Sequence, residues 1–241
     1  MKKIVAALLV LHMGFSGNAQ VLISIIFGDK LNSDKLEFGL MVSPTLCNIT
    51  QDSAKYRFGL GLALYFNLKL GDRFYFHPEA IPKSVMGARH IKPYPTGDST
   101  LDRLFTGGEV IRKINAISLP LLIRYRITGL WFFQTGPQID WMLETNDEFK
   151  NSVNGSDLTY TKKIGENITN FDVGWAVGLV YKFEKQISMS MGIRYFYGLT
   201  DIVKTSTGNQ HNSTWLLNLY IPIGAGKAAA KKQQPQQAPP R

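Results

Sequence analysis

Hydrophobic and polar residues alternate with a period of two along most of the chain. In the clearest stretch, from Phe171 to Phe183, the odd positions carry Phe, Val, Trp, Val, Leu, Tyr and Phe, and the even positions carry Asp, Gly, Ala, Gly, Val and Lys. Successive side chains of a β-strand point to opposite faces, so this pattern predicts a strand with one apolar face. Because the other face holds glycines and charges, we expect the apolar face to meet lipid and the polar face to line a barrel.

Seven further stretches show the same alternation, although the third of the eight is weaker. Together they predict an all-β fold, an eight-stranded antiparallel transmembrane β-barrel. The expected strands lie at residues 36–44, 58–70, 74–80, 117–127, 131–143, 171–183, 187–198 and 215–223.

The connections between these stretches alternate between short and long. The short ones, which have tight-turn compositions, are Gly71-Asp72, Thr128-Gly129 and Glu184-Lys185. The longest are 87–112 and 146–168, and 200–212 is intermediate. Outer-membrane barrels have short periplasmic turns and long outer loops, so we expect the long loops outside the cell. An even number of strands then places both termini in the periplasm.

Four regions follow from this pattern. We expect a signal peptide at 1–19, because two lysines precede a short apolar run and small residues before a cleavage site. Residues 20–34 should form an N-terminal segment on the periplasmic side. The barrel should occupy 35–223, and the Ala-, Lys-, Gln- and Pro-rich stretch 224–241 should be a disordered periplasmic tail.

Composition narrows the functional classes. The 241 residues (27.0 kDa) suffice for one domain, and after the leader no apolar run is long enough for a membrane helix. The net charge of +9 includes two leader lysines and four charges of the tail, so it gives little support to nucleic-acid binding. The single cysteine, Cys47, cannot form an internal disulfide.

Aromatic residues gather at both ends of the predicted strands, as in the interfacial girdles of membrane barrels. The girdle expected at the periplasmic end comprises Phe66, Phe74, Tyr125, Trp131, Tyr181 and Phe183. The girdle expected at the outer end comprises Phe58, Trp141, Phe171, Tyr197 and Trp215.

Charged residues fall on the inward parity of the predicted strands. An eight-stranded barrel is only wide enough for its side chains, so these charges must pair or meet water. We expect a salt-bridged plug in which Glu79 pairs with Arg124 or Arg194; the alternative is a narrow ion pathway. The set comprises Glu37, Arg57, Lys69, Glu79, Arg124, Arg126, Asp140, Asp172, Lys182 and Arg194.

One motif offers an enzymatic alternative. His211-Asn-Ser213, at the start of the last strand, resembles the His-x-Ser part of outer-membrane lipid A deacylases, but no acidic residue follows Ser213 to orient the histidine. His77 and His90 lack metal-ligand spacing to cysteine or carboxylates, so we expect no metal and no cofactor.

Several motifs resemble those of the PorT-like outer-membrane β-barrel family. They are His77–Glu79 (HPE), Ile117–Tyr125 (ISLPLLIRY), Thr135–Pro137 (TGP), Arg194–Asp201 (RYFYGLTD) and the opening segment Val21–Ser33. The resemblance covers residues 21 to about 223 and implies an outer-membrane location; some members are associated with type IX secretion. Members usually end on the last strand, whereas this chain continues into a tail.

These observations predict a non-enzymatic outer-membrane barrel that acts as a structural or accessory part of an outer-membrane assembly, which could be secretion-related. Its expected partners are outer-membrane lipid and a protein in the outer membrane or periplasm, and not nucleic acid. A small porin-like channel is the first alternative, and a lipid-modifying hydrolase is the second.

Overall fold

The computed structural model describes residues 35–51, 53–183, 189–204 and 209–223. The strands within these ranges are β1 (Leu36–Ile49), β2 (Arg57–Lys69), β3 (Phe74–Ile91), β4 (Glu109–Thr128), β5 (Trp131–Val153), β6 (Ser156–Lys163), β7 (Phe171–Lys182), β8 (Ser190–Gly198) and β9 (Asn212–Pro222). A short helix, α3 (Ser99–Phe105), and a 3₁₀ turn, η1 (Gly165–Asn167), lie between strands. The expectations for the leader, for 20–34, for the Glu184-Lys185 turn and for the tail lie outside the described residues.

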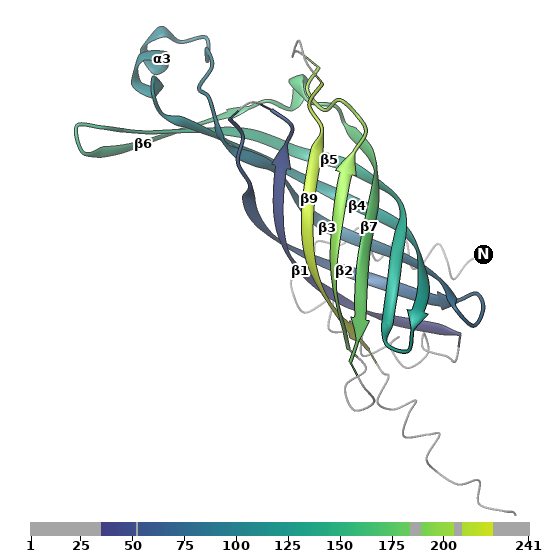
Figure 1. The fold of residues 1–241 in the computed structure, drawn as a ribbon. Coiled ribbons are helices and arrows are strands. Elements are labelled where there is room, and N and C mark those ends of the chain that lie inside the picture. Colours follow the sequence, from purple (N-terminus) through teal and green to yellow (C-terminus); the bar gives the residue numbers. More distant parts are fainter. Residues whose placement is uncertain (1–34, 52, 184–188, 205–208, 224–241) are drawn as a thin grey trace, which may run out of the picture.

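Eight of the strands close into an antiparallel ring (Figure 1). Around the ring the order is β1, β2, β3, β4, β5, β7, β8 and β9, and β9 pairs again with β1. Strand β6 lies outside the ring because it pairs with β5 alone. The eight-stranded antiparallel barrel expected from the alternation is thus confirmed, and one further strand is added to it.

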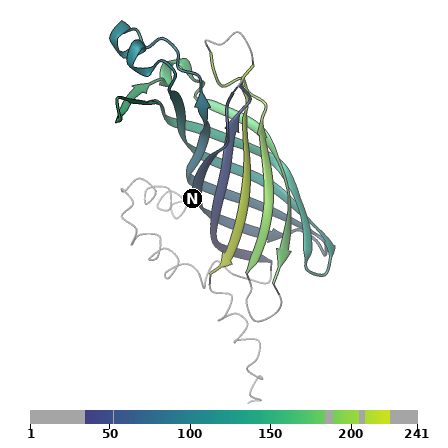
Figure 2. The same ribbon diagram turned by 60° about the vertical axis from the view of Figure 1, so that its left-hand side comes forward.

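Much of the two longest connections is strand rather than loop. Strand β3 continues to Ile91, β4 begins at Glu109, and β5 and β6 form a hairpin that turns at Asn154-Gly155. We call the resulting structure the platform: residues 85–91 of β3, 109–115 of β4, 144–153 of β5, all of β6, and α3 with its flanking loop. Figure 2 shows the platform at one end of the barrel and the short turns at the other.

A β-bulge marks the start of the platform. Asn115 pairs with Glu144 and Ala116 pairs with Met142, so Leu143 has no opposite residue on β4. A bulge of one residue reverses the inward and outward parity of a strand. Before the bulge, Trp141 points outward and is 53% exposed; after it, Thr145, Asp147 and Phe149 are buried.

The outward face of the ring carries an apolar band. Its large apolar side chains include Leu60 on β2, Trp175 on β7 and Leu217 on β9, which are 52%, 52% and 50% exposed. On the platform, the outward face of β4 and β5 changes to charged and amide side chains. The change from apolar to polar outward side chains indicates that the platform lies outside the apolar environment that surrounds the band. In the described part of the chain, no helix is long and apolar enough to cross a membrane.

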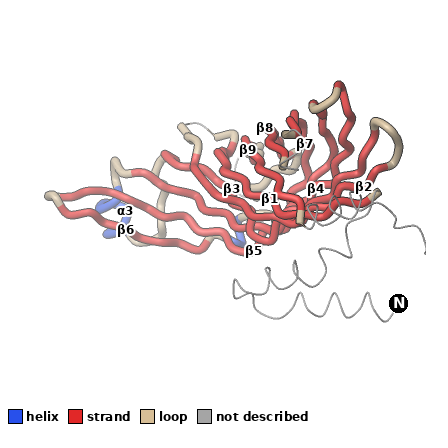
Figure 3. Tube along the Cα trace, turned by 90° about the horizontal axis from the view of Figure 1, so that it is seen from below, coloured by secondary structure: helices blue, strands red, loops and turns tan. Residues whose placement is uncertain are grey.

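The interior is filled by two layers of side chains. The half nearer the short turns holds buried polar and charged groups together with Tyr65 and Tyr220. The half nearer the platform holds an apolar cluster that continues onto the underside of the platform. The ring is therefore a packed core rather than an open tube. Figure 3 shows the β5–β6 hairpin extending away from it.

Candidate functional site

A buried ion pair crosses the lumen, by which we mean the interior of the ring. Glu79 lies on β3 and Arg194 on β8, and these strands are four places apart in the eight-stranded ring. The Arg194 Nη2 atom donates to Glu79 Oε2 at 2.8 Å, and both side chains are completely buried. Opposite walls of the barrel are thus joined by a charge-assisted hydrogen bond.

Neutral polar groups complete the surroundings of this carboxylate. The Tyr220 hydroxyl donates to Glu79 Oε1 at 3.2 Å, and His77 Nε2 lies 3.1 Å from the same oxygen. Arg124 donates to Gln134 at 2.9 Å and lies over the Tyr220 ring, 4.3 Å from its centroid. Parity alone would place His77 and Tyr220 in the lumen, but their sequence carries no signal that they share one carboxylate.

Every strand of the ring contributes a buried side chain near this level. A sphere the size of water reaches 5% or less of each, so the lumen is closed to water in this conformation. The residues, taken around the ring, are Met41, Ala63, Glu79, Arg124, Gln134, Val180, Arg194 and Asn218.

A pair of acidic residues lies nearer the platform. Asp140 on β5 is opposite Asp172 on β7, and both are completely buried. Gln138 Nε2 donates to Asp140 at 2.9 Å, and Asn212 Nδ2 donates to Asp172 at 2.9 Å. A side chain at Gly198 would collide with the Asp172 carboxylate, so the glycine keeps room for this acid. Among the described residues, neither aspartate has a cation within ion-pair distance.

The remaining predicted luminal charges lie toward the two ends. Lys182 lies 3.7 Å from Glu37 at the turn end, where both are partly exposed. Arg126 contacts the Tyr75 hydroxyl on the same side, and Lys69 pairs with the exposed Asp72 at the β2–β3 turn. At the other end, Arg57 donates to the Met86 carbonyl oxygen at 2.8 Å.

The predicted aromatic residues occupy the two ends of the ring. At the turn end Phe74 packs on Tyr125, and Trp131 packs on Tyr181. Phe66 lies beside Phe38 and Phe183 beside Tyr181, and the ring centroids of these four pairs are 5.0–5.6 Å apart. At the platform end Trp141 stacks on Phe171 at 5.7 Å, and Trp215 packs on Tyr195 at 4.7 Å. Phe58 is 67% exposed there, and Tyr197 packs on His211.

A second buried ion pair fastens the platform. Arg112 on β4 makes two hydrogen bonds to Asp147 on β5, at 2.9 and 2.7 Å. The Tyr94 hydroxyl donates to the same carboxylate at 2.7 Å. Burial raises the pKa of Tyr94, and the charge of Asp147 raises it further. These residues were not among the expected site residues, because the sequence pattern assigned both segments to loops.

Aromatic packing holds α3 against the underside of the platform. Phe105, the buried residue of the helix, lies 5.9 Å from Phe149 and 6.4 Å from Tyr160, measured between ring centroids. Asp98 caps the helix by accepting from the backbone N–H groups of its first turn. The amide and hydroxyl of Thr96 donate to Asp102 and lower the pKa of that carboxyl. The loop is therefore folded onto the sheet.

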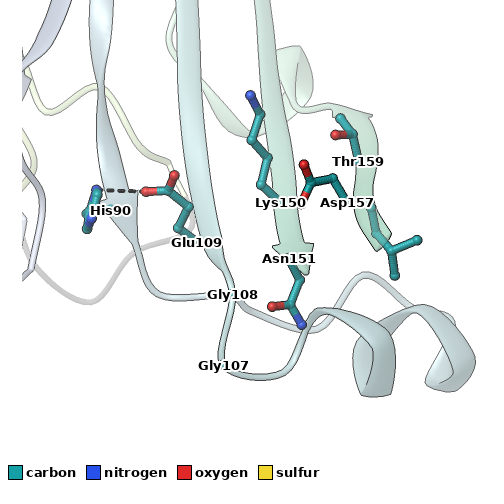
Figure 4. A pocket seen from close by; sticks show the side chains of 9 residues that line it. His90, Gly107, Gly108, Glu109, Lys150, Asn151, Asp157 and Thr159 are labelled. Carbon is teal, nitrogen blue, oxygen red and sulfur yellow. Dashed lines mark ion pairs between the residues drawn. The ribbon is translucent and has the colours of Figure 1, made fainter. Parts of the chain in front are cut away.

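An open pocket of about 560 Å³ lies at the tip of the platform (Figure 4). His90 and Glu109 form an ion pair of 2.7 Å on one side, and Lys150, Asn151 and Asp157 come from the hairpin. Its lining is mixed in charge, with Gly107 and Gly108 at the base of the loop. This surface can bind polar groups but presents no apolar cradle.

The catalytic alternative gains no geometric support. His211 Nδ1 lies 3.1 Å from the Thr200 carbonyl oxygen, and its ring packs on Tyr197 at 5.6 Å. Ser213 is buried at the start of β9, and no hydrogen bond between the two is seen in the described residues. The described ranges also contain no group of three or more His, Cys, Asp or Glu residues placed to hold a metal ion.

A family model described as outer membrane protein beta-barrel domain matches residues 27–204. The chain belongs to this family. It is therefore an outer-membrane β-barrel protein, and the apolar band of the ring faces membrane lipid. The match identifies this family, and it does not distinguish the PorT-like proteins within it.

A search of solved structures also found proteins that resemble this chain at low sequence identity. Ail, the attachment invasion locus protein of Yersinia pestis, crystallised with the heparin analogue sucrose octasulfate, has a TM-score of 0.42 and 11% identity over 77% of this chain and 97% of Ail. Neisserial surface protein A has a TM-score of 0.39 and 12% identity, over 76% and 96%. OprG of Pseudomonas aeruginosa has a TM-score of 0.31 and 11% identity, over 78% and 91%. No curated protein matches the chain.

Proposed function

We propose that this protein is a non-enzymatic, non-conducting outer-membrane barrel that presents the platform as a contact surface at the cell exterior. The closed lumen carries this proposal: side chains from all eight ring strands leave a water-sized sphere almost no access near Glu79 and Arg194. The platform supports it as well, because its buried Arg112–Asp147 pair and folded loop hold a defined surface beyond the apolar band.

The finer assignment follows from the motifs. The PorT-like motifs on β4 and β8 favour an accessory role in an outer-membrane assembly. Because some PorT-like proteins are associated with type IX secretion, the assembly that we propose is secretion-related. In this proposal the barrel anchors the complex in lipid, and a protein partner binds outside the membrane layer. The partner contacts would lie on the platform, on the N-terminal segment, or on the tail after Ile223.

The first prediction concerns conductance. Purified protein in a planar lipid bilayer is expected to give no stable conductance steps, because the Glu79–Arg194 layer closes the lumen. Detergent alone serves as the negative control and a general porin as the positive control. Reproducible, long-lived steps from the wild-type chain would replace this proposal with the porin-like alternative.

The second prediction concerns orientation. We propose that the platform is extracellular and that both termini are periplasmic, because the short turns, the start of β1 and the end of β9 lie at the end opposite the platform (Figure 2). In a Cys47→Ser background, Ser156→Cys at the hairpin tip should react with a membrane-impermeant maleimide on whole cells. Asp72→Cys in the β2–β3 turn and Gln234→Cys in the tail should react only after the outer membrane is permeabilised.

Both outcomes of this labelling are informative. Ser156 and Asp72 are exposed, so neither substitution removes a packed side chain, and Cys47 is buried in the wild-type protein. Labelling of Asp72→Cys on intact cells, with Ser156→Cys protected, would invert the topology and remove the exterior contact surface from the proposal.

A further inference from the structure

Strand β6 leaves one edge of the platform sheet open. On one side it pairs with β5 from Ser156 to Lys163, and in the described parts of the chain no strand or bridge lies on its other side. An open edge offers unpaired backbone N–H and C=O groups to another strand. Because the hairpin projects sideways beyond the ring, a second strand can reach this edge without meeting the barrel wall (Figures 1 and 3).

The sequence of β6 is complementary to itself when read in the opposite direction. Around Tyr160, antiparallel self-pairing places Thr159 opposite Thr161 and Leu158 opposite Lys162. It also places Asp157 opposite Lys163, at both ends of the pair. Opposite charges and β-branched residues directly across an antiparallel pair are favourable. A second copy of the same strand is therefore a matched partner for this edge.

The two faces of β6 differ in their contacts: the outward face is exposed, and the inner face packs on the platform. Asp157, Thr159, Thr161 and Lys163 are exposed on the outward face, and neither Asp157 nor Lys163 forms an ion pair with another described residue. On the inner face Lys162 donates to the Thr96 carbonyl oxygen at 3.0 Å and lies over the Tyr94 ring. Natural edges are often protected by a lysine of this kind, but here the lysine is held by its own platform. The outward charges attract a second copy rather than repel it.

We propose that two copies of this chain associate through β6, antiparallel and centred on Tyr160, so that the two platforms form one continuous sheet. The strand has eight residues, which makes a small interface. Such an interface gives a weak association that depends on protein concentration. Confinement to a membrane raises the local concentration of the copies.

A charge exchange tests the proposed pairing. Asp157→Lys places lysine opposite Lys163 twice, and Lys163→Asp places aspartate opposite Asp157 twice. Each single variant creates two like-charge pairs and is expected to weaken dimerisation roughly tenfold. The double variant Asp157→Lys/Lys163→Asp should restore dimerisation, because both cross-strand pairs again carry opposite charges. Analytical ultracentrifugation of the full chain in detergent measures the dissociation constant.

Crosslinking tests the register independently of charge. In a Cys47→Ser background, a mixture of Thr159→Cys and Thr161→Cys protein should form a disulfide-linked dimer when a mild oxidant is added. Each variant alone should form much less, because its two cysteines are diagonal neighbours about 7–8 Å apart and beyond disulfide distance. A monomer at all concentrations, single variants that crosslink as well as the mixture, or charge variants that dimerise like the wild type would each overturn the proposal. Heat-modified mobility on gels verifies that every variant is folded. A monomeric protein would leave the conductance result unchanged, so the two proposals fail separately.

Discussion

Replacing Arg194 by methionine is expected to destabilise the barrel by about 3–5 kcal/mol, the cost of leaving one partner of a buried ion pair unpaired. Methionine retains a long side chain, so the loss comes mainly from the charge. The Glu79 carboxylate would remain at the centre of a dry lumen with only His77 and Tyr220 as partners. Equilibrium unfolding in urea with lipid vesicles, followed by tryptophan fluorescence, measures the change.

Two controls separate the ion pair from general damage. Glu79→Gln/Arg194→Met removes both charges and should recover much of the loss, because an apolar or neutral replacement of a whole buried pair is often tolerated. Asp72→Asn removes the exposed partner of Lys69 and should cost about 1 kcal/mol or less. If Arg194→Met were as stable as Asp72→Asn, the charges would not be buried against each other, and the lumen would be open to water.

The second large effect is expected at the platform. Asp147→Asn should free the loop at 92–108 while the ring stays folded, because Arg112 loses its charged partner. The amide nitrogen that replaces one carboxylate oxygen also cannot accept a hydrogen bond from Arg112 or Tyr94. The local cost is about 3–5 kcal/mol, as for other broken buried pairs. Limited trypsin digestion should then cut after Arg103, which the folded loop protects in the wild-type chain. Heat-modified mobility should remain unchanged.

Glu148→Gln provides a matched control for this variant. It makes the same change of charge at the next residue, but Glu148 points outward and pairs with the partly exposed Lys113 and Lys150. The expected cost is about 1 kcal/mol or less, with wild-type protection from trypsin. Equal sensitivity of both variants would mean that the Arg112–Asp147 pair does not fasten the loop.

The barrel itself could be predicted because its strands repeat a single rule. Alternation from Phe171 to Lys182 places one residue in two against lipid, and the same rule holds for the other ring strands. The platform strands follow a different rule. Val110 and Ile114 are buried, but Glu109 and Lys113 point outward, so the segment lacks an apolar stripe and its composition suggests a loop. The bulge at Leu143 also reverses the parity, and a fixed period cannot reveal it.

The sequence predicts which residues face the lumen, but not which of them contact each other. Parity alone puts Glu79, Arg124 and Arg194 inside. It does not say which arginine reaches the carboxylate, because that depends on the tilt and stagger of the strands in the closed ring. Arg124 binds Gln134 and lies over Tyr220, while Arg194 crosses the barrel to Glu79. The hydrogen-bond partners of these side chains depend on how the strands are arranged in the closed ring. That arrangement cannot be inferred from any short segment of the sequence.

The ion pair across the lumen has a consequence for assembly. Glu79 and Arg194 come from opposite walls, and their strands become opposite walls only when β1 meets β9. In a sheet that has not yet closed, both side chains lie on its concave side, where water solvates them separately. Closing the ring removes this water and brings the charges together in one event. The same contact that shuts the lumen therefore makes a half-inserted sheet less stable than the finished barrel, and favours insertion that goes to completion.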